Sequence, residues 1–185
     1  MRLTIPTILT LFRILLIPVL VVVFYVPQPW TNFAATFVFV LGALTDWADG
    51  WIARRWNQYS AFGAFLDPVA DKLAVTVALL LIVELHHTHW MTMLAAIIIG
   101  REIAISALRE WMAEVGHGRK VQVAWLGKLK TIVQMVAISL LLYRQDLLGL
   151  PIFWIGEVLL GVAAALTLMS GFGYLRAAWP SLRGD

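Results

Sequence analysis

Four aspartates lie close together in an otherwise apolar part of the chain. A charged side chain inside a bilayer is costly, so four acids in one place indicate a cation that holds them there. The stretch that carries them has no cysteine and no histidine. Carboxylate oxygens without sulfur or imidazole favour Mg²⁺ or Mn²⁺ over zinc or copper. The four residues are Asp46, Asp49, Asp67 and Asp71.

The spacing of these acids places them in two pairs. On helices, Asp46 and Asp49 are separated by i, i+3, and Asp67 and Asp71 by i, i+4, so each pair projects from one face. Two helices joined by a short turn pack side by side and bring the two faces together. Four acids exceed the charge of one divalent ion, so the pattern predicts two metal ions about 3.5 to 4 Å apart that clamp a phosphoryl group.

Small residues lie one turn from three of the four acids. Glycine in a helix interior costs roughly 0.5 to 1 kcal/mol relative to alanine, so glycines here indicate the close approach of a ligand or of another helix. Arg54 follows in the same stretch and is placed to meet a phosphate. The small residues are Gly50, Ala53 and Gly63.

The composition is that of an integral membrane protein. The chain has 185 residues, of which 61% are hydrophobic and 14% charged, and its mean hydropathy is +0.84. We therefore expect residues 1–185 to form a single domain of membrane helices. The net charge of +3 is dispersed over short loops, which is typical of orientation in an anionic membrane and argues against a nucleic-acid partner.

Six apolar segments have the length of a membrane crossing, about 20 residues. They predict an all-α, polytopic membrane protein with six transmembrane helices. Arg13 interrupts the first apolar run, and Val-Pro-Gln-Pro follows it where a cleavage site would need small residues, so we expect a retained helix instead of a signal peptide. The predicted spans are 6–26, 30–55, 60–84, 90–115, 125–143 and 151–178.

Lysine and arginine are distributed unequally between the two sides of these spans. One side carries only Arg144, so the positive-inside rule places both termini in the cytoplasm. The four aspartates then lie near the cytoplasmic interface. The basic residues of the other side are Arg2, Arg54, Arg55, Arg119, Lys120, Arg176 and Arg183.

A second group of basic residues lies on the fourth and fifth spans. Arg101 and Arg109 are two turns apart and roughly 80° apart around a helix, so they can converge on one polar face. Lys128 and Lys130 begin the fifth span. These four residues predict a basic cavity wall suited to a phosphomonoester.

Other interpretations remain open at this point. The acids could form ion pairs with nearby cations, or line a cation pathway across the membrane. The basic residues of the fourth span could pair with neighbouring glutamates while the lysines only fix orientation. We interpret the histidines of the third loop as a solvated interface and not as a second metal site. The residues concerned are Arg54, Arg55 and Lys72; Glu102 and Glu110; and His86, His87 and His89.

The acidic stretch resembles the signature of the CDP-alcohol phosphotransferase family. That signature is Asp-x-x-Asp-Gly-x-x-Ala-Arg, eight residues, then Gly-x-x-x-Asp-x-x-x-Asp, and every fixed position is present from Asp46 to Asp71. The resemblance implies a metal-dependent enzyme with six transmembrane helices, usually a homodimer, that transfers a substituted phosphate from a CDP-linked donor to an alcohol and releases CMP.

The resemblance also implies roles for individual residues. Asp71 joins the metal ligands or acts as the general base. The small residues and the arginine accommodate the cytidine diphosphate. The implied metal ligands are Asp46, Asp49, Asp67 and Asp71, and the implied cytidine diphosphate contacts are Gly50, Ala53, Arg54 and Gly63.

Outside the signature, residues 5–13, 101–110 and 127–131 resemble bacterial members of the family that join CDP-diacylglycerol and sn-glycerol 3-phosphate. This implies a bacterial cytoplasmic membrane protein with its active site at the cytoplasmic face. Many such members have asparagine at the position of Thr7. Members that make phosphatidylinositol phosphate or cardiolipin share the signature, so other acceptors remain open.

Overall fold

The computed structural model describes residues 4–56, 60–114 and 125–183, and all of its regular elements are α-helices. Each predicted span corresponds to one helix, which confirms the all-α architecture. The bounds differ from the predicted ones mainly at the C-terminus, where the last helix continues to Arg183. The helices are α1 (Ile5–Tyr25), α2 (Thr31–Trp56), α3 (Ala61–His86), α4 (His89–Glu114), α5 (Trp125–Tyr143) and α6 (Ile152–Arg183).

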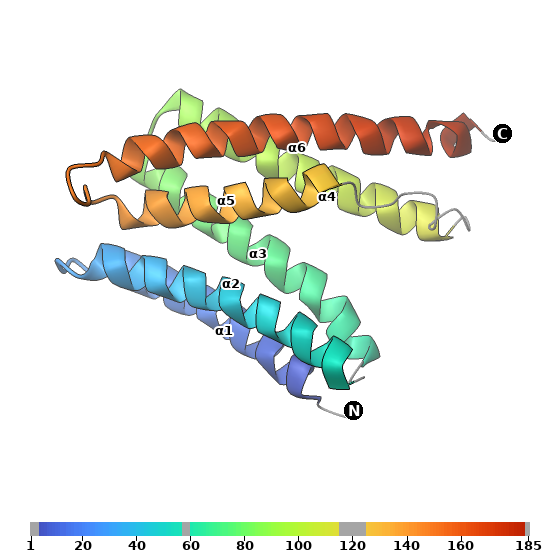
Figure 1. Cartoon of the computed structure of the whole chain (residues 1–185), viewed down its shortest axis with the longest axis horizontal. Coiled ribbons are helices and arrows are strands. Elements are labelled where there is room, and N and C mark those ends of the chain that lie inside the picture. The colour runs from blue at the N-terminus through green and yellow to red at the C-terminus, as the bar shows by residue number, and fades with distance from the viewer. Residues whose placement is uncertain (1–3, 57–59, 115–124, 184–185) are drawn as a thin grey trace.

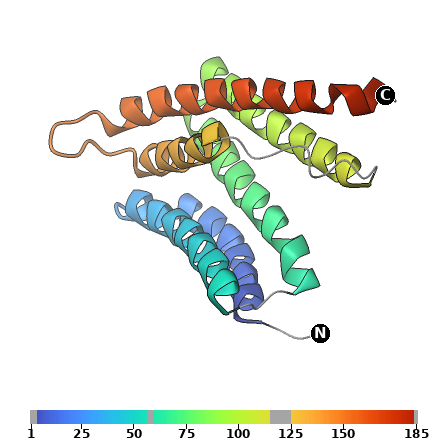
Figure 2. The same ribbon diagram turned by 45° about the vertical axis from the view of Figure 1, so that its right-hand side comes forward.

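The helices run alternately in opposite directions along one bundle (Figure 1). α1 packs against α2, and α5 against α6, while α3 contacts α1, α4 and α5. Because the described residues form an even number of alternating helices, the start of α1 and the end of α6 lie at the same end of the bundle (Figures 1 and 2). This agrees with termini on one side of a membrane, and the cytoplasmic side stays a prediction.

The hydrophobic core receives side chains from all six helices. Leu79, Ile138 and Leu160 are fully buried at its centre. Large apolar side chains also cover the outside, where Phe33 and Phe172 are 65% and 71% exposed. Exposed aromatic rings on a helical bundle are unfavourable in water and favourable against lipid tails, so the exterior supports a membrane location.

Three helices are long and apolar enough to cross a membrane by length and composition. They are α1, α4 and the part of α6 from Ile152 to Arg176. In α5 the described apolar segment is shorter, Leu129–Tyr143. α2 and α3 carry the four aspartates, and charged residues lower the mean hydropathy of a span. The structure therefore supports a polytopic membrane protein, while the crossings of α2, α3 and α5 stay predictions.

The contact between α5 and α6 depends on a glycine, which gives a stability prediction. A Cβ at Gly156 would lie 3.0 Å from Leu141 Cγ and 3.1 Å from Leu140 Cβ, whereas a Cβ at Gly173 meets nothing within 4 Å. Both glycines lie within α6, so replacing either by alanine raises the helix propensity by the same amount, and this gain cancels when the two variants are compared. We expect Gly156→Ala to be less stable than Gly173→Ala by about 1 to 3 kcal/mol because the helices must move apart.

Thermal unfolding of the two variants in the same detergent, followed by circular dichroism, measures this difference. Equal stabilities would contradict the close packing of α5 on α6 at this position.

Candidate active site

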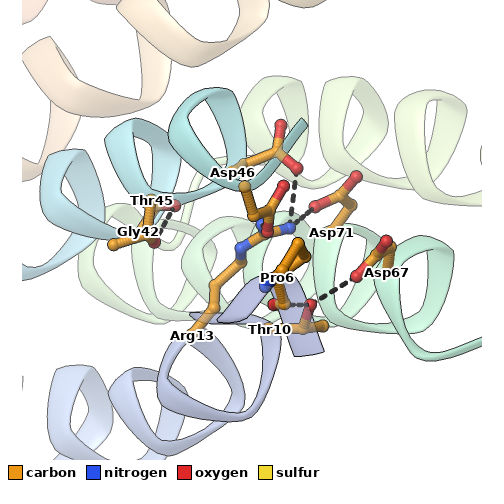
Figure 3. Close-up of polar contacts among 9 residues, drawn as sticks. Pro6, Thr10, Arg13, Gly42, Thr45, Asp46, Asp67 and Asp71 are labelled. Atoms are coloured by element: carbon orange, nitrogen blue, oxygen red, sulfur yellow. Dashed lines mark hydrogen bonds and ion pairs between the residues drawn. The ribbon is translucent and has the colours of Figure 1, made fainter. Parts of the chain in front are cut away.

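The cation that lies between the aspartates is Arg13 of α1. Its Nη1 is 2.8 Å from Asp46 Oδ1, and its guanidinium also forms ion pairs with Asp49 and Asp71. Figure 3 shows the Arg13 side chain reaching from α1 toward Asp46 on α2 and Asp71 on α3. Arg13 is 2% exposed. Three helices are therefore joined by one buried guanidinium, which sequence reasoning treated only as an interruption of the first span.

The fourth aspartate has a different partner on the same helix. Thr10 Oγ1 lies within hydrogen-bond distance of Asp67 Oδ1 and 3.0 Å from the carbonyl oxygen of Pro6, so its one hydroxyl proton is shared between these two acceptors. Thr10 is fully buried. α1 thus supplies a buried polar partner to each of the four acids. A signal for this was present in the sequence, because Thr10 and Arg13 are three residues apart and share one helix face.

Gly63 lies where α1 approaches the start of α3. Ser60 caps α3 by accepting a 2.9 Å hydrogen bond from the Gly63 N–H, and its Oγ lies 2.7 Å from Thr7 Oγ1. A Cβ at Gly63 would lie 2.9 Å from Ser60 Oγ and 3.0 Å from Thr7 Oγ1. The approach of a helix therefore accounts for this glycine. Its predicted contact with a cytidine diphosphate stays a prediction.

The remaining predicted cytidine diphosphate contacts belong to α2. Gly50 and Ala53 are half-buried, next to the acids of the same helix. The side chain of Arg54 lies outside the described part of the structure. Their contact with a nucleotide stays a prediction.

A cavity of about 210 Å³ connects the acidic cluster to the basic part of the molecule. Arg13, Asp46 and Asp71 form one end, and Glu102 of α4 and Lys130 of α5 lie on its wall. Apolar side chains of α1, α2, α3 and α5 complete the lining. Residues widely separated in the sequence thus share one pocket. Its other polar lining residues are Lys72, Thr131 and Gln134.

Of the predicted phosphate-binding residues, Lys130 is the one that lines this cavity within the described part of the chain. It is 4% exposed, and its Nζ donates a 2.7 Å hydrogen bond to Glu102 Oε2. A buried lysine with a single carboxylate partner can exchange that partner for a phosphate.

The predicted basic residues of α4 are not among the residues that line this cavity, although Arg101 shares Glu102 Oε2 with Lys130. Arg101 turns toward α6, where it donates a 2.8 Å hydrogen bond to Ser170 Oγ and lies over the Tyr174 ring. Its Nη1 is 3.4 Å from Glu102 Oε2, as the ion-pair interpretation expected. Arg109 is exposed. The side chain of Lys128 lies outside the described residues, so the convergence of all four on one phosphate stays a prediction.

Two further polar residues of the cavity were missed as site residues. Lys72, considered above only as an ion-pair partner for the acids, donates a hydrogen bond to Ser106 of α4. Gln134 is 4% exposed, and its Oε1 has no hydrogen-bond partner among the described residues. A buried amide oxygen on a cavity wall can accept a hydrogen bond from a ligand hydroxyl. Helical spacing could not indicate either residue, because each faces the cavity from a different helix.

The donor set of the acidic cluster fits a divalent cation in its chemistry. Hard carboxylate oxygens from α2 and α3 already converge on one cation, Arg13. Among the described residues, no three acidic or histidine side chains stand close enough together to bind one metal ion. Because the oxygens surround a broad guanidinium, they would have to close in to bind an ion. The residues that would bind a metal are thus largely those that bind Arg13.

The pair between Lys130 and Glu102 gives a second stability prediction. Glu102→Gln would leave a buried ammonium without its carboxylate, so we expect a loss of about 2 kcal/mol in the free energy of unfolding. Glu114→Gln is the matched control, because Glu114 is an exposed glutamate of the same helix. Thermal unfolding in detergent compares the two, and an equal effect of both changes would contradict a buried ion pair.

Comparison with known proteins identifies the family of the chain. Residues 3–173 match the model of the CDP-alcohol phosphatidyltransferase family. A protein of Escherichia coli (strain K12) is 54% identical over 181 residues, and one of Shigella flexneri serotype 5b (strain 8401) is 54% identical over 178 residues, with 96% of each chain covered in both cases. Both are named CDP-diacylglycerol–glycerol-3-phosphate 3-phosphatidyltransferase. The chain is a member of the CDP-alcohol phosphatidyltransferase family.

Proposed function

We propose that this protein transfers the phosphatidyl group of CDP-diacylglycerol to sn-glycerol 3-phosphate, which yields phosphatidylglycerophosphate and CMP. The observation that carries the proposal is one cavity that is lined both by Asp46 and Asp71 of the acidic cluster and by the buried Lys130. Such a cavity can hold a diphosphate at its acidic end through cations and an acceptor phosphate on Lys130. The relatives named for this reaction align with nearly the whole chain.

The acidic end is assigned to the donor. The family is a phosphotransferase class that generally uses divalent metals, and we assign Mg²⁺ or Mn²⁺ to a two-metal site here. When bound, these ions neutralise the donor diphosphate and the charge of the departing CMP. The assigned metal ligands are Asp46, Asp49, Asp67 and Asp71, and the assigned cytidine diphosphate contacts are Gly50, Ala53, Arg54 and Gly63.

Asp71 is assigned as the general base. Its side chain is 50% exposed and lines the cavity, whereas the side chain of Asp49 is 6% exposed. Of these two carboxylates, Asp71 is the one that an acceptor can reach. It takes the proton of the primary hydroxyl, the alkoxide oxygen forms a bond to the phosphorus that carries diacylglycerol, and the bond from that phosphorus to CMP breaks. Holding both phosphates in one pocket supplies much of the acceleration.

The proposal also covers the other basic residues, the placement of the protein in the membrane and its oligomeric state. Arg101, Arg109 and Lys128 complete the basic side toward the acceptor phosphate together with Lys130. The acyl chains stay in the bilayer beside the helices, and the active site faces the cytoplasm of a bacterial cell from its cytoplasmic membrane. We expect a homodimer.

The direct test uses the purified protein in mixed micelles with CDP-diacylglycerol and Mg²⁺ or Mn²⁺. Glycerol 3-phosphate, inositol phosphate, serine and phosphatidylglycerol are supplied in parallel, and CMP is quantified. We expect CMP release only in the sample that contains glycerol 3-phosphate. In that sample, removal of the metal with EDTA should abolish CMP release. Release with another acceptor would assign a different member activity, and metal flux into proteoliposomes without CMP release would favour a cation carrier.

Asp71→Asn tests the base. The amide keeps the shape of the side chain but cannot accept the proton, so we expect kcat to fall by about 10² to 10⁴. Mn²⁺ binding, measured by electron paramagnetic resonance, shows whether the metals are retained. Near-normal turnover with metal bound would refute the assignment.

Lys130→Met tests the acceptor site. Because Lys130 lines the cavity and Arg109 is exposed, we expect KM for glycerol 3-phosphate to rise at least about tenfold more in Lys130→Met than in Arg109→Met, as expected for loss of a charge-assisted contact to phosphate. KM for CDP-diacylglycerol is the internal control. A larger effect of Arg109→Met would move the acceptor phosphate away from the cavity.

A further inference from the structure

Arg13 contacts one oxygen of each of three carboxylates that a metal would need. Nη1 lies between Asp46 Oδ1 and Asp71 Oδ1, and Nη2 pairs with Asp49 Oδ2. Three of the four carboxylates therefore share one positive charge, and the side chain that carries it is buried. Without that charge, the three adjacent carboxylates, of which Asp49 is buried, would repel one another.

A guanidinium and a divalent ion repel each other when they share these carboxylates. Two cations that contact the same carboxylate lie only a few ångströms apart, where their repulsion is strong in a medium of low dielectric constant. The acids would also have to close in around a metal, because the described side chains do not form a metal-sized group around the guanidinium. Arg13 must then leave at least some of its three carboxylates.

The cavity offers a place for the displaced side chain. Arg13 already lines it together with Lys72 and Lys130, and its Nε is buried without a hydrogen-bond partner among the described residues. A guanidinium matches phosphate oxygens with two parallel hydrogen bonds, which a lysine cannot do. A phosphate bound in the cavity would supply the charge and the acceptors that Arg13 gives up at the acids.

We propose that Arg13 is an exchangeable internal counter-ion. It neutralises Asp46, Asp49 and Asp71 in the metal-free protein, yields them to divalent ions, and then pairs with a substrate phosphate in the cavity. The inference rests on the proposed function for the metals and the phosphate. It assigns to Arg13 a part in both binding events, so that metal loading prepares the cavity for phosphate.

The test is a titration of the purified protein with Mn²⁺ alone, followed by electron paramagnetic resonance. Arg13→Gln removes the cation that competes with Mn²⁺. We therefore expect the Kd of this variant for Mn²⁺ to be about tenfold or more lower than the Kd of the unchanged protein, because the carboxylates no longer have to be released from Arg13 before the metal binds. Lys72→Gln is the matched control, because it removes one positive charge from the same cavity without a described contact to the acids.

Stability supplies a second readout. In EDTA we expect Arg13→Gln to unfold at a lower temperature than the unchanged protein. Added Mn²⁺ should raise the Tm of Arg13→Gln more than it raises the Tm of the unchanged protein. Arg13→Lys keeps the charge without the fork and should give an intermediate Kd for Mn²⁺. If Arg13→Gln does not fold, Arg13→Lys decides by the same comparison.

Equal or weaker Mn²⁺ binding in the Arg13 variants, or an equal gain in Lys72→Gln, would overturn the exchange. With Mn²⁺ saturating, CDP should bind Arg13→Gln about tenfold more weakly, as expected for loss of a charge-assisted pair, and unchanged CDP affinity would also overturn it. A protein that shows this competition but releases no CMP from CDP-diacylglycerol would refute the proposed function alone.

Discussion

The structure depends on the neutralisation of acids inside a largely apolar bundle. Arg13 connects α1 to Asp46 and Asp49 on α2 and to Asp71 on α3. Because an uncompensated buried charge is far more costly than a missing apolar contact, these ion pairs constrain how the three helices can pack. The hydrogen bond from Thr10 to Asp67 adds the fourth acid to the same helix. The same contacts of α1 therefore neutralise the acids of the site and hold α1 against α2 and α3.

The cavity joins two groups of internal ion pairs, those of Arg13 and that of Lys130, with complementary charges. At one end a cation is held by carboxylates, and on the wall a carboxylate, Glu102, is held by Lys130. Arg13 is positively charged, as are the metals proposed to bind the same aspartates. Glu102 is negatively charged, as is the acceptor phosphate proposed to bind Lys130. Binding would then exchange one ion pair for another instead of burying new charge, which keeps the desolvation cost of each step low.

Much of the architecture was predictable because it is local. The lengths of the apolar runs predicted six helices, and the i, i+3 and i, i+4 spacings placed each pair of acids on one helix face. The partners of the acids were not predicted. Arg13 stood alone in an apolar run, where a hydropathy average hides it, and Thr10 resembled an ordinary helix residue. Arg101 was expected to face a phosphate beside Lys130. It shares Glu102 Oε2 with Lys130 and also donates to Ser170 of α6, a contact that spacing did not indicate, and its role at a phosphate stays a prediction.

The sequence by itself predicted the candidate site residues and determined which of them share a helix face, because helical periodicity acts within about one or two turns. Only the tertiary structure decided which faces meet. It selected Arg13 as the cation of the acidic cluster, assigned Gly63 to the contact with Thr7, and placed Lys130 and Glu102 on the wall of the cavity lined by Asp71. These pairings join residues on different helices, and they follow from packing and charge neutralisation, which spacing along one helix does not encode.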